Sequence, residues 1–360
     1  MRTRQTADSW IGVMALATIV AAYVVATAAA QAQADQKAAA VMSDVRKALG
    51  GEQKLAGVKA LSLRADYRRE VGAGMPGGGG TMMIIRSGGG AGNADGGTQQ
   101  TGKIEIDLEL PDKYLRSDVG SAAFGMTRTE GFEGTRPFVE MVPNSPGMRV
   151  MADNPAQDPA RVKAALKRSN VELARLMLGL TGSTQPGFAV TYAYGGEAES
   201  PDGKAHIIDV NGPEDFKARL FIDTQTNLPL MVSFIEAEPR MVMRTMTRDG
   251  KPGQRGAQGA PVVVPGDGRG HPPSVATGTP PSLTPEQQAE LDKARAESEA
   301  TPPKMIEYRL FFSDYEKVDG IALPRRIARG TGGKTTEEWD VTSYKVNPPL
   351  KADRFKVGSH

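Results

Sequence analysis

Apolar residues near the start of the chain recur every three or four positions and stop at the glycine pair Gly50-Gly51. The members of this stripe are Ala38, Val41, Met42, Val45 and Leu49. This spacing places them on one side of an α-helix, and glycine commonly ends a helix. The pattern therefore predicts an amphipathic helix up to the glycine pair.

After this helix the apolar period changes to two, which is the period of a strand with one wet face. A first alternating block starts at Lys59 and has its apolar positions at Leu61, Leu63, Ala65 and Tyr67. A second block has Ile104, Ile106, Leu108 and Leu110, each separated from the next by an acidic residue. It turns at Pro111-Asp112 into Lys113–Asp118, which predicts a β-hairpin.

The remainder of the chain adds one helical segment and several short strands. Helical spacing runs from Asp158 to Gly179 with an interruption near Ser169-Asn170, so we expect one broken helix or two short ones. Strand patterns occur at Phe188–Tyr194, Lys204–Val210, Phe216–Asp223, Leu228–Glu236, Lys304–Lys317, Ile321–Ala328 and Lys334–Val346. Short strands at regular spacing predict a mainly β (α+β) fold built on an antiparallel meander.

The N-terminus has the order of a secretory signal peptide. Arg2 and Arg4 precede an apolar run from Trp10 to Ala30, and Ala32-Gln33-Ala34 follows. The alternative is a membrane anchor, but small residues and threonines dilute the run. We expect cleavage of residues 1–34, which leaves a single β domain over residues 35–360 in the periplasm or outside the cell. The chain has no cysteine, so we expect neither an N-terminal lipid nor stable membrane insertion after cleavage.

Two stretches interrupt the strand pattern. Residues 72–101 contain two glycine blocks around Thr81–Arg86, which predicts a short strand between flexible loops. Residues 248–303 begin with a segment rich in Gly, Pro and Ala that has too few bulky residues to offset the entropy of ordering. Within this insertion, Thr284-Pro285 has the features of a helix start, so we expect a surface helix to about Ala300.

Charge and composition exclude several function classes. Without residues 1–34, two arginines and Asp8 are lost and the formal net charge falls from +2 to +1. So small a charge gives little electrostatic attraction for nucleic acid, and we expect no nucleic-acid partner. The absence of cysteine excludes disulfides, so the fold must rest on its buried core.

Segments that imitate catalytic motifs do not have the required context. Ala328–Thr335 is similar to a phosphate-binding loop, but strand-like alternation follows it, so a hairpin turn is favoured. The three histidines lack metal-ligand spacing. Glu337 and Glu338 fall on opposite faces of a strand and are interpreted as residues that keep the sheet soluble. We expect no enzyme activity, no catalytic residues, no cofactor and no metal site.

Methionine is the unusual component of the composition, with 16 residues. Thioethers adapt to irregular apolar partners, which suits either a ligand cavity or ordinary core packing. A third alternative is Cu(I) binding by Met241, Met243 and Met246, because soft thioethers select that ion.

The order of these segments resembles the periplasmic lipoprotein carrier and localisation superfamily (LolA/LolB/RseB-like). The resemblance is carried by Gly102–Arg116, Gly131-Phe-Glu-Gly134, Ala218–Pro229 and Asn347–Val357. It implies an antiparallel half-open β-barrel whose concave face is covered by helices and holds acyl chains. This chain departs from the carriers at Leu110, where they have a basic residue before the proline.

The sequence and the resemblance together predict a periplasmic, non-catalytic binding protein for an apolar ligand, a lipid or acyl chain. Its partner would be a lipid or a lipidated protein. The residues expected to line the ligand cavity are Leu61, Leu63, Ile104, Ile106 and Leu108, because each alternates with polar neighbours. The alternative function is an envelope sensor or scaffold that binds another protein.

Overall fold

The computed structural model describes residues 33–70, 99–120, 126–143, 158–201, 203–238, 302, 304–351 and 353–356. Nearly all of them belong to one compact unit, made of Met1–Gly77, Asn93–Glu236 and Ile306–His360; a second unit comprises Gly78–Gly92 and Ala237–Met305. The predicted signal peptide, apart from its last two residues, lies outside the described residues, as do most of the glycine-rich stretch and of the insertion with its expected helix. In the described part of the chain, no helix has the length and apolar character needed to cross a membrane.

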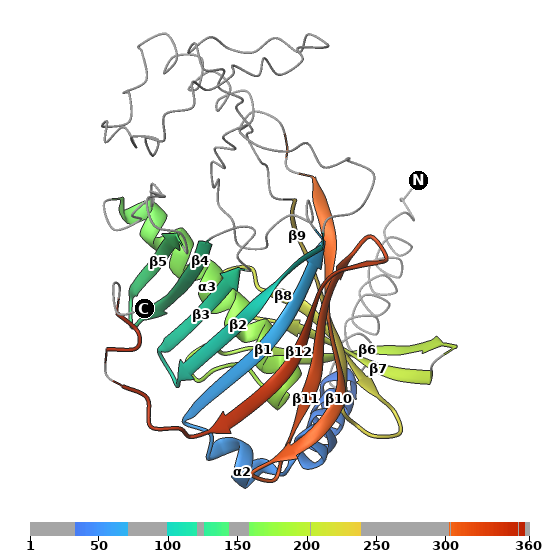
Figure 1. Cartoon of the computed structure of the whole chain (residues 1–360). Helices are drawn as coiled ribbons and strands as arrows, with labels where there is room; N and C mark the ends of the chain where they lie inside the picture. The colour runs from blue at the N-terminus through green and yellow to red at the C-terminus, as the bar shows by residue number, and fades with distance from the viewer. Residues whose placement is uncertain are drawn as a thin grey trace, which may run out of the picture. The chain divides into compact units, whose positions relative to one another are not determined.

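Twelve antiparallel strands form one sheet, in the order β5-β4-β3-β2-β1-β12-β11-β10-β9-β8-β7-β6. Since β5 and β6 are its two ends, the sheet is not closed on itself, and the predicted half-open antiparallel fold is confirmed (Figure 1). The strands are β1 (Ala60–Glu70), β2 (Gln99–Glu109), β3 (Lys113–Gly120), β4 (Met126–Glu133), β5 (Arg136–Pro143), β6 (Thr191–Ser200), β7 (Gly203–Asn211), β8 (Lys217–Asp223), β9 (Pro229–Ala237), β10 (Met305–Val318), β11 (Ile321–Thr331) and β12 (Lys334–Val346).

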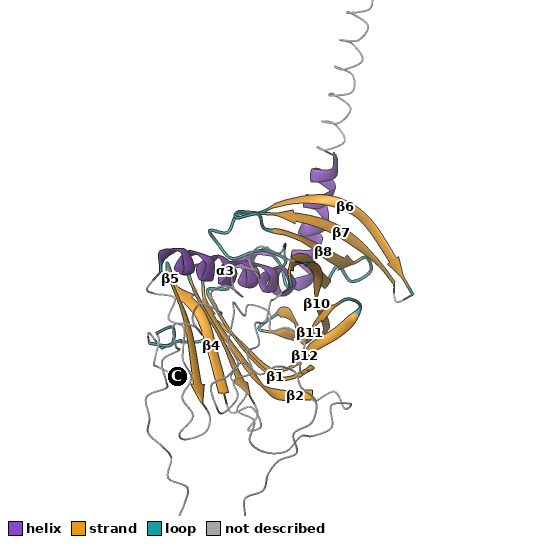
Figure 2. Cartoon of the chain, turned by 90° about the horizontal axis from the view of Figure 1, so that it is seen from above, coloured by secondary structure: helices purple, strands orange, loops and turns teal. Residues whose placement is uncertain are grey.

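Within the described ranges, three helices accompany the sheet: the predicted N-terminal helix over residues 33–49, the short α2 (Glu52–Ala56) and the long α3 (Pro159–Thr181). Helix α3 contacts β4 and β5 at one end of the sheet and β8 and β11 towards the other. Figure 2 shows the curved sheet with α3 between its two ends. The sheet face that packs on α3 is called the inner face below, and the opposite face the outer face.

Helix α3 is continuous, so the expected interruption near Ser169-Asn170 is wrong. The Asn170 side chain donates to the Leu166 carbonyl, one turn earlier, at 3.0 Å. This local bond lets a polar residue stay within the helix instead of ending it. The true ends are Asp158, whose carboxylate accepts the Ala160 N–H at 2.9 Å, and Gly182.

The β4–β5 hairpin was not predicted from the sequence. Its inward positions include Arg128 and Glu130, which form an ion pair at 2.7 Å, so the usual apolar alternation is missing. Gly131 in β4 is required sterically, because a Cβ there would lie 1.9 Å from the Tyr114 carbonyl oxygen in β3. Charged inward residues therefore hid the alternation of β4.

The turn between β11 and β12 confirms the hairpin interpretation of the segment that is similar to a phosphate loop. Thr331 and Lys334 are its last paired residues. Between them, Gly332 and Gly333 both have positive φ, 57° and 79°, which is what a two-residue hairpin turn of this hand requires.

The C-terminal segment packs on the outer face rather than in the main core. Phe355 joins Leu115 and Phe138 in a small second cluster of buried residues. Next to it, Arg354 donates from Nε to Asp107 at 2.7 Å and from Nη2 to Glu105 at 2.9 Å. The segment thus covers outward side chains of β2, β3 and β5.

Asp107 leads to a testable dependence of stability on pH. Burial alone would raise its pKa, but hydrogen bonds from Arg64, Ser62 and Arg354 outweigh burial and lower it. A carboxyl group whose pKa is lowered on folding stabilises the protein above its unfolded pKa of about 4, and this contribution disappears as pH falls through the folded pKa. Asp107→Asn should therefore reduce the free energy of unfolding by about 1–3 kcal/mol at pH 7.

Urea unfolding at pH 7 and at pH 3 checks this expectation, with Asp66→Asn as an exposed control on the same face. The difference between wild type and Asp107→Asn should narrow at pH 3. If the two proteins differ in unfolding free energy by the same amount at both pH values, the lowered pKa of Asp107 is contradicted.

Candidate functional site

The five residues predicted to line a ligand cavity lie together on the inner face. Leu61 is directly opposite Leu108, and Leu63 is directly opposite Ile106, with Ile104 one inward position further along β2. All five are at most 3% exposed and belong to the main hydrophobic core. Their contact with a ligand stays a prediction.

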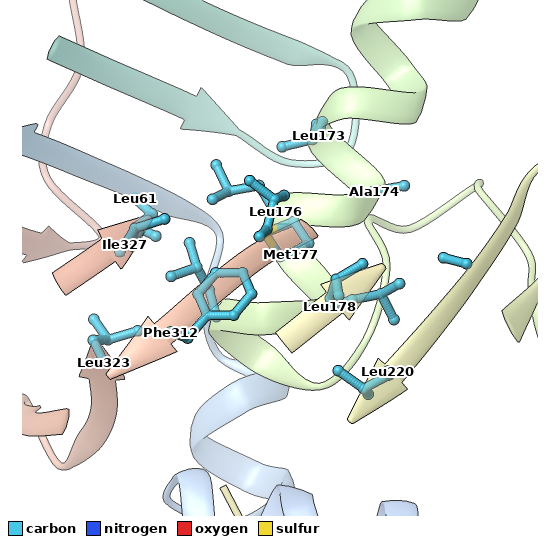
Figure 3. Packing of buried hydrophobic residues seen from close by; sticks show 14 of the residues in the cluster. Leu61, Leu173, Ala174, Leu176, Met177, Leu178, Leu220, Phe312, Leu323 and Ile327 are labelled. Atoms are coloured by element: carbon cyan, nitrogen blue, oxygen red, sulfur yellow. The ribbon is translucent and has the colours of Figure 1, made fainter. Parts of the chain in front are cut away.

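Helix α3 supplies the apolar cover of this face. Its buried residues include Leu173, Leu176 and Met177. Figure 3 shows Leu176 and Met177 beside Phe312 of β10. The approach is close at Gly179, where an added Cβ would lie 2.0 Å from the Phe312 ring. The N-terminal helix belongs to the same core cluster through the residues of its predicted stripe.

A cluster of charged side chains, here called the buried ion cluster, continues the inner face beyond its apolar part. Its members come from β1, β3, β11, β12 and α3, and they are Arg69, Arg116, Asp118, Glu172, Arg329 and Glu337. Glu337 is directly opposite Arg69 on one side and Arg329 on the other. Three neighbouring strands therefore carry a row of alternating charge.

Glu337 is the deepest carboxylate of the cluster, at 2% exposed. It accepts from Arg69 Nε at 3.0 Å and from Arg116 Nη2 at 3.5 Å. Trp339, on the same strand, also donates its indole N–H to this carboxylate. The expectation that Glu337 keeps the sheet soluble is wrong, whereas Glu338 does lie on the outer face, where Arg68 pairs with it at 3.2 Å.

Arg116 joins the sheet part of the cluster to α3. Its guanidinium donates to Asp118 at 2.9 Å and to Glu172, on the helix, at 2.6 Å. Arg329 Nη2 lies 3.7 Å from the same Glu172 oxygen. Asp118 also accepts from Arg69, at 3.2 Å. Glu172 is thus the contact through which the helix meets two arginines of the sheet.

The pKa directions favour the ionised forms of Glu337 and Arg116. Burial would raise the pKa of Glu337, but Arg69, Arg116 and Arg329 outweigh it and lower the pKa. Burial would lower the pKa of Arg116, yet the surrounding carboxylates raise it well above its usual value. Such mutual stabilisation is needed because an isolated buried charge is very unfavourable.

Glu130, on the neighbouring strand β4, behaves differently. Burial raises its pKa, and Arg128 opposes this only in part. Burial therefore favours the neutral form of the Glu130 carboxyl group, in contrast to Glu337.

Several buried arginine N–H groups have no hydrogen-bond partner among the described residues. They include Arg69 Nη1, Arg175 Nε and Arg329 Nε. An unsatisfied buried donor usually costs about 1–3 kcal/mol, more when it is charged. Two of these arginines, Arg69 and Arg329, belong to the cluster, which therefore has unused capacity to bind an acceptor.

Sequence reasoning missed this cluster, although the strand phase contained a signal for it. Arg69 continues the inward series of Leu61, Leu63 and Tyr67 along β1. Glu337 is likewise in phase with the buried Trp339. A charged residue at a strand position where the alternation predicts an inward side chain can thus be predicted to be a buried ion.

Other candidate chemistry of the sequence stays apart from this site. His206 Nδ1 lies 3.2 Å from the Tyr194 hydroxyl, in the β6–β7 hairpin. No group of three metal-ligating His, Cys, Asp or Glu side chains occurs in the described ranges. Met241, Met243 and Met246, the Cu(I) candidates, lie outside them.

Comparison with known proteins finds similarity only among solved structures; no family model and no curated protein matches the chain. A LolA superfamily protein, NE2245 from Nitrosomonas europaea, is 9% identical with a TM-score of 0.40, over 88% of this chain and 96% of that one. The likeness is one of fold.

Two further structures extend this likeness. A DUF1329 family protein from Desulfovibrio piger is 9% identical, with a TM-score of 0.37, over 89% of this chain and 97% of that one. A putative outer membrane lipoprotein-sorting protein domain from Vibrio parahaemolyticus is 8% identical, with a TM-score of 0.38, over 88% and 94%.

Proposed function

We propose that the chain is a periplasmic, non-catalytic binding protein that holds an apolar ligand, a lipid or acyl chain, against the inner face of its sheet. The observation that carries this proposal is that the apolar part of the inner face belongs to a single hydrophobic core, whose cover includes a helix, α3, rather than a second sheet. The signal-peptide pattern at the N-terminus supports a location in the periplasm.

A helical cover suits reversible binding for a physical reason. The backbone hydrogen bonds of an α-helix are made within the helix, whereas a strand of a cover sheet would share them with its neighbours. Helix α3 can therefore move without breaking any backbone ladder of the sheet. An acyl chain that replaces Leu176 or Met177 exchanges one apolar contact for another.

Ile106→Glu tests this proposal, with a fluorescent fatty acid as the probe. Wild type should bind the probe, and the variant should bind at least about tenfold more weakly, because an unpaired carboxylate among apolar groups is costly. Asp66→Ala is the control, since Asp66 is exposed on the outer face. Glu105, the neighbour of Ile106, is less suitable because it pairs with Arg354 at 2.9 Å.

Circular dichroism must show that both variants fold, and hydrogen exchange locates the site if Ile106→Glu does not. Probe binding to wild type should then change the exchange of the α3 amides. A probe that does not bind wild type, or that binds without altering α3 and binds Ile106→Glu equally, contradicts the proposal.

A second candidate function, binding of another envelope protein, is favoured by exposed apolar residues on the outer face. Ile235 in β9 is 65% exposed and Phe311 in β10 is 37% exposed. Each is next to a buried, inward-facing residue of its own strand: Phe234 beside Ile235, and Leu310 and Phe312 beside Phe311. Half-buried Phe221 and Met231 are directly opposite each other on the same face.

Photo-crosslinking in the periplasm tests this second function. A crosslinker at position 235 should give a discrete crosslinked band with one protein, and a crosslinker at Asp66 on the same face should not. Equal labelling from both positions would argue against a specific partner surface at Ile235.

A further inference from the structure

We infer that the buried ion cluster binds the anionic headgroup, a carboxylate or a phosphate, of the amphiphile whose chain lies on the inner face. This inference rests on the proposed function and adds the chemical class of the ligand. It assigns a role to a set of buried charges that the apolar binding surface alone does not explain.

The first argument is the unused donors of the cluster. Arg69 is 4% exposed and its Nη1 has no hydrogen-bond partner in the described part of the chain; the same holds for Nε of the buried Arg329. A guanidinium carries five N–H donors in a planar fork that matches the oxygens of a carboxylate or phosphate. Two buried guanidiniums with free donors on one face therefore favour an anionic acceptor.

The second argument is the position of the cluster relative to the apolar surface. Leu63 and Arg69 both point inward from β1, six residues apart, which is about 20 Å at ~3.3 Å per residue. A single extended amphiphile along this strand would contact the leucine with its chain and reach the ion cluster, of which Arg69 is a member, with its headgroup.

The third argument is that a carboxylate of the covering helix α3 already occupies the position that we assign to the headgroup of the ligand. Glu172 of α3 contacts Arg116 at 2.6 Å and Arg329 at 3.7 Å. Its side chain is 18% exposed, more than that of any other member of the cluster. It can therefore turn towards solvent when α3 moves, and a ligand anion that replaces it keeps the charge of the cluster balanced.

Calorimetry with three ligands of equal chain length tests the inference: dodecanoate, dodecyl phosphate and uncharged 1-lauroylglycerol. Wild type should bind at least one of the two anions about tenfold or more tightly than the uncharged ligand, since a charge-assisted pair contributes that much. The tighter of the two anions identifies the headgroup as a carboxylate or a phosphate.

Two variants separate the headgroup from the chain. Glu172→Gln removes the competing charge with little change of shape, so it should bind the anions about three- to tenfold more tightly and 1-lauroylglycerol as wild type does. Arg329→Gln should lose the preference for anions. Glu338→Gln, on the outer face of β12, is the matched control and should match wild type with all three ligands.

The outcomes distinguish this inference from the proposed function. If none of the three ligands binds, the proposed function fails. If all three bind equally and Glu172→Gln changes nothing, the apolar site stands and the headgroup site is overturned. Should Arg329→Gln not fold, the result with the nearly isosteric Glu172→Gln decides.

Discussion

Replacing Arg116 with methionine is expected to lower the free energy of unfolding by about 3–5 kcal/mol, the usual effect of removing one partner of a buried ion pair. Arg116 is 3% exposed and contacts Asp118, Glu172 and Glu337. Without its guanidinium, three carboxylates lose a counter-charge in a place that water reaches poorly. Urea unfolding at neutral pH measures the loss.

Arg68→Met is the matched control for this experiment. Arg68 lies in β1 on the outer face and pairs with Glu338 and Asp340 at 3.2 Å each, but its side chain is about half exposed. Exposed ion pairs contribute only about 0–1 kcal/mol. A loss at Arg116 no larger than that at Arg68 would show that the cluster does not stabilise the fold.

The second large effect is expected at Gly179, in the last turn of α3, where the helix closely approaches Phe312 of β10. Gly179→Ala should destabilise the protein by about 1–3 kcal/mol through overpacking, although alanine is favoured over glycine in a helix by about 1 kcal/mol. The added Cβ would lie 2.0 Å from Phe312 Cζ, and this ring is fully buried. Thermal or urea unfolding measures the change.

A double-variant cycle makes the cause specific. Gly179→Ala combined with Phe312→Leu should be less destabilised than the sum of the two single variants, because leucine has no atom at the site of the clash. Ser169→Ala in the same helix is expected to change stability by no more than about 0.5 kcal/mol. Additive losses at Gly179 and Phe312 would contradict the close approach.

The strands with a simple alternation were predictable from the sequence, and those with paired inward charges were not. In β1 and β2 the apolar residues follow a period of two, so element and buried face could both be assigned. In β4, Arg128 and Glu130 occupy inward positions and pair with each other, so the apolar alternation that would identify the strand is missing. A local pattern shows which residues are apolar but not which charges will be neutralised.

For single members of the buried ion cluster, the inward direction could be predicted from the sequence, but their pairing with one another could not. The strand phase indicates that Arg69 and Glu337 point inward. Their pairing depends on β1 lying beside β12, and 268 positions separate these two residues in the chain. Strand order is set by the packing of the whole sheet, so no window of sequence contains it.

The pairing of β1 with β12 also has a consequence for the folding of the chain. The first and last strands of the described sheet meet near its middle, and the register joins Leu61 to Val346. Contacts between such distant segments raise the contact order, which slows folding. Because a chain is synthesised from its N-terminus, β12 is the last of these strands to be made. Until then the sheet is two separate halves, and loss of the C-terminal strand would divide the protein at its centre instead of trimming its edge.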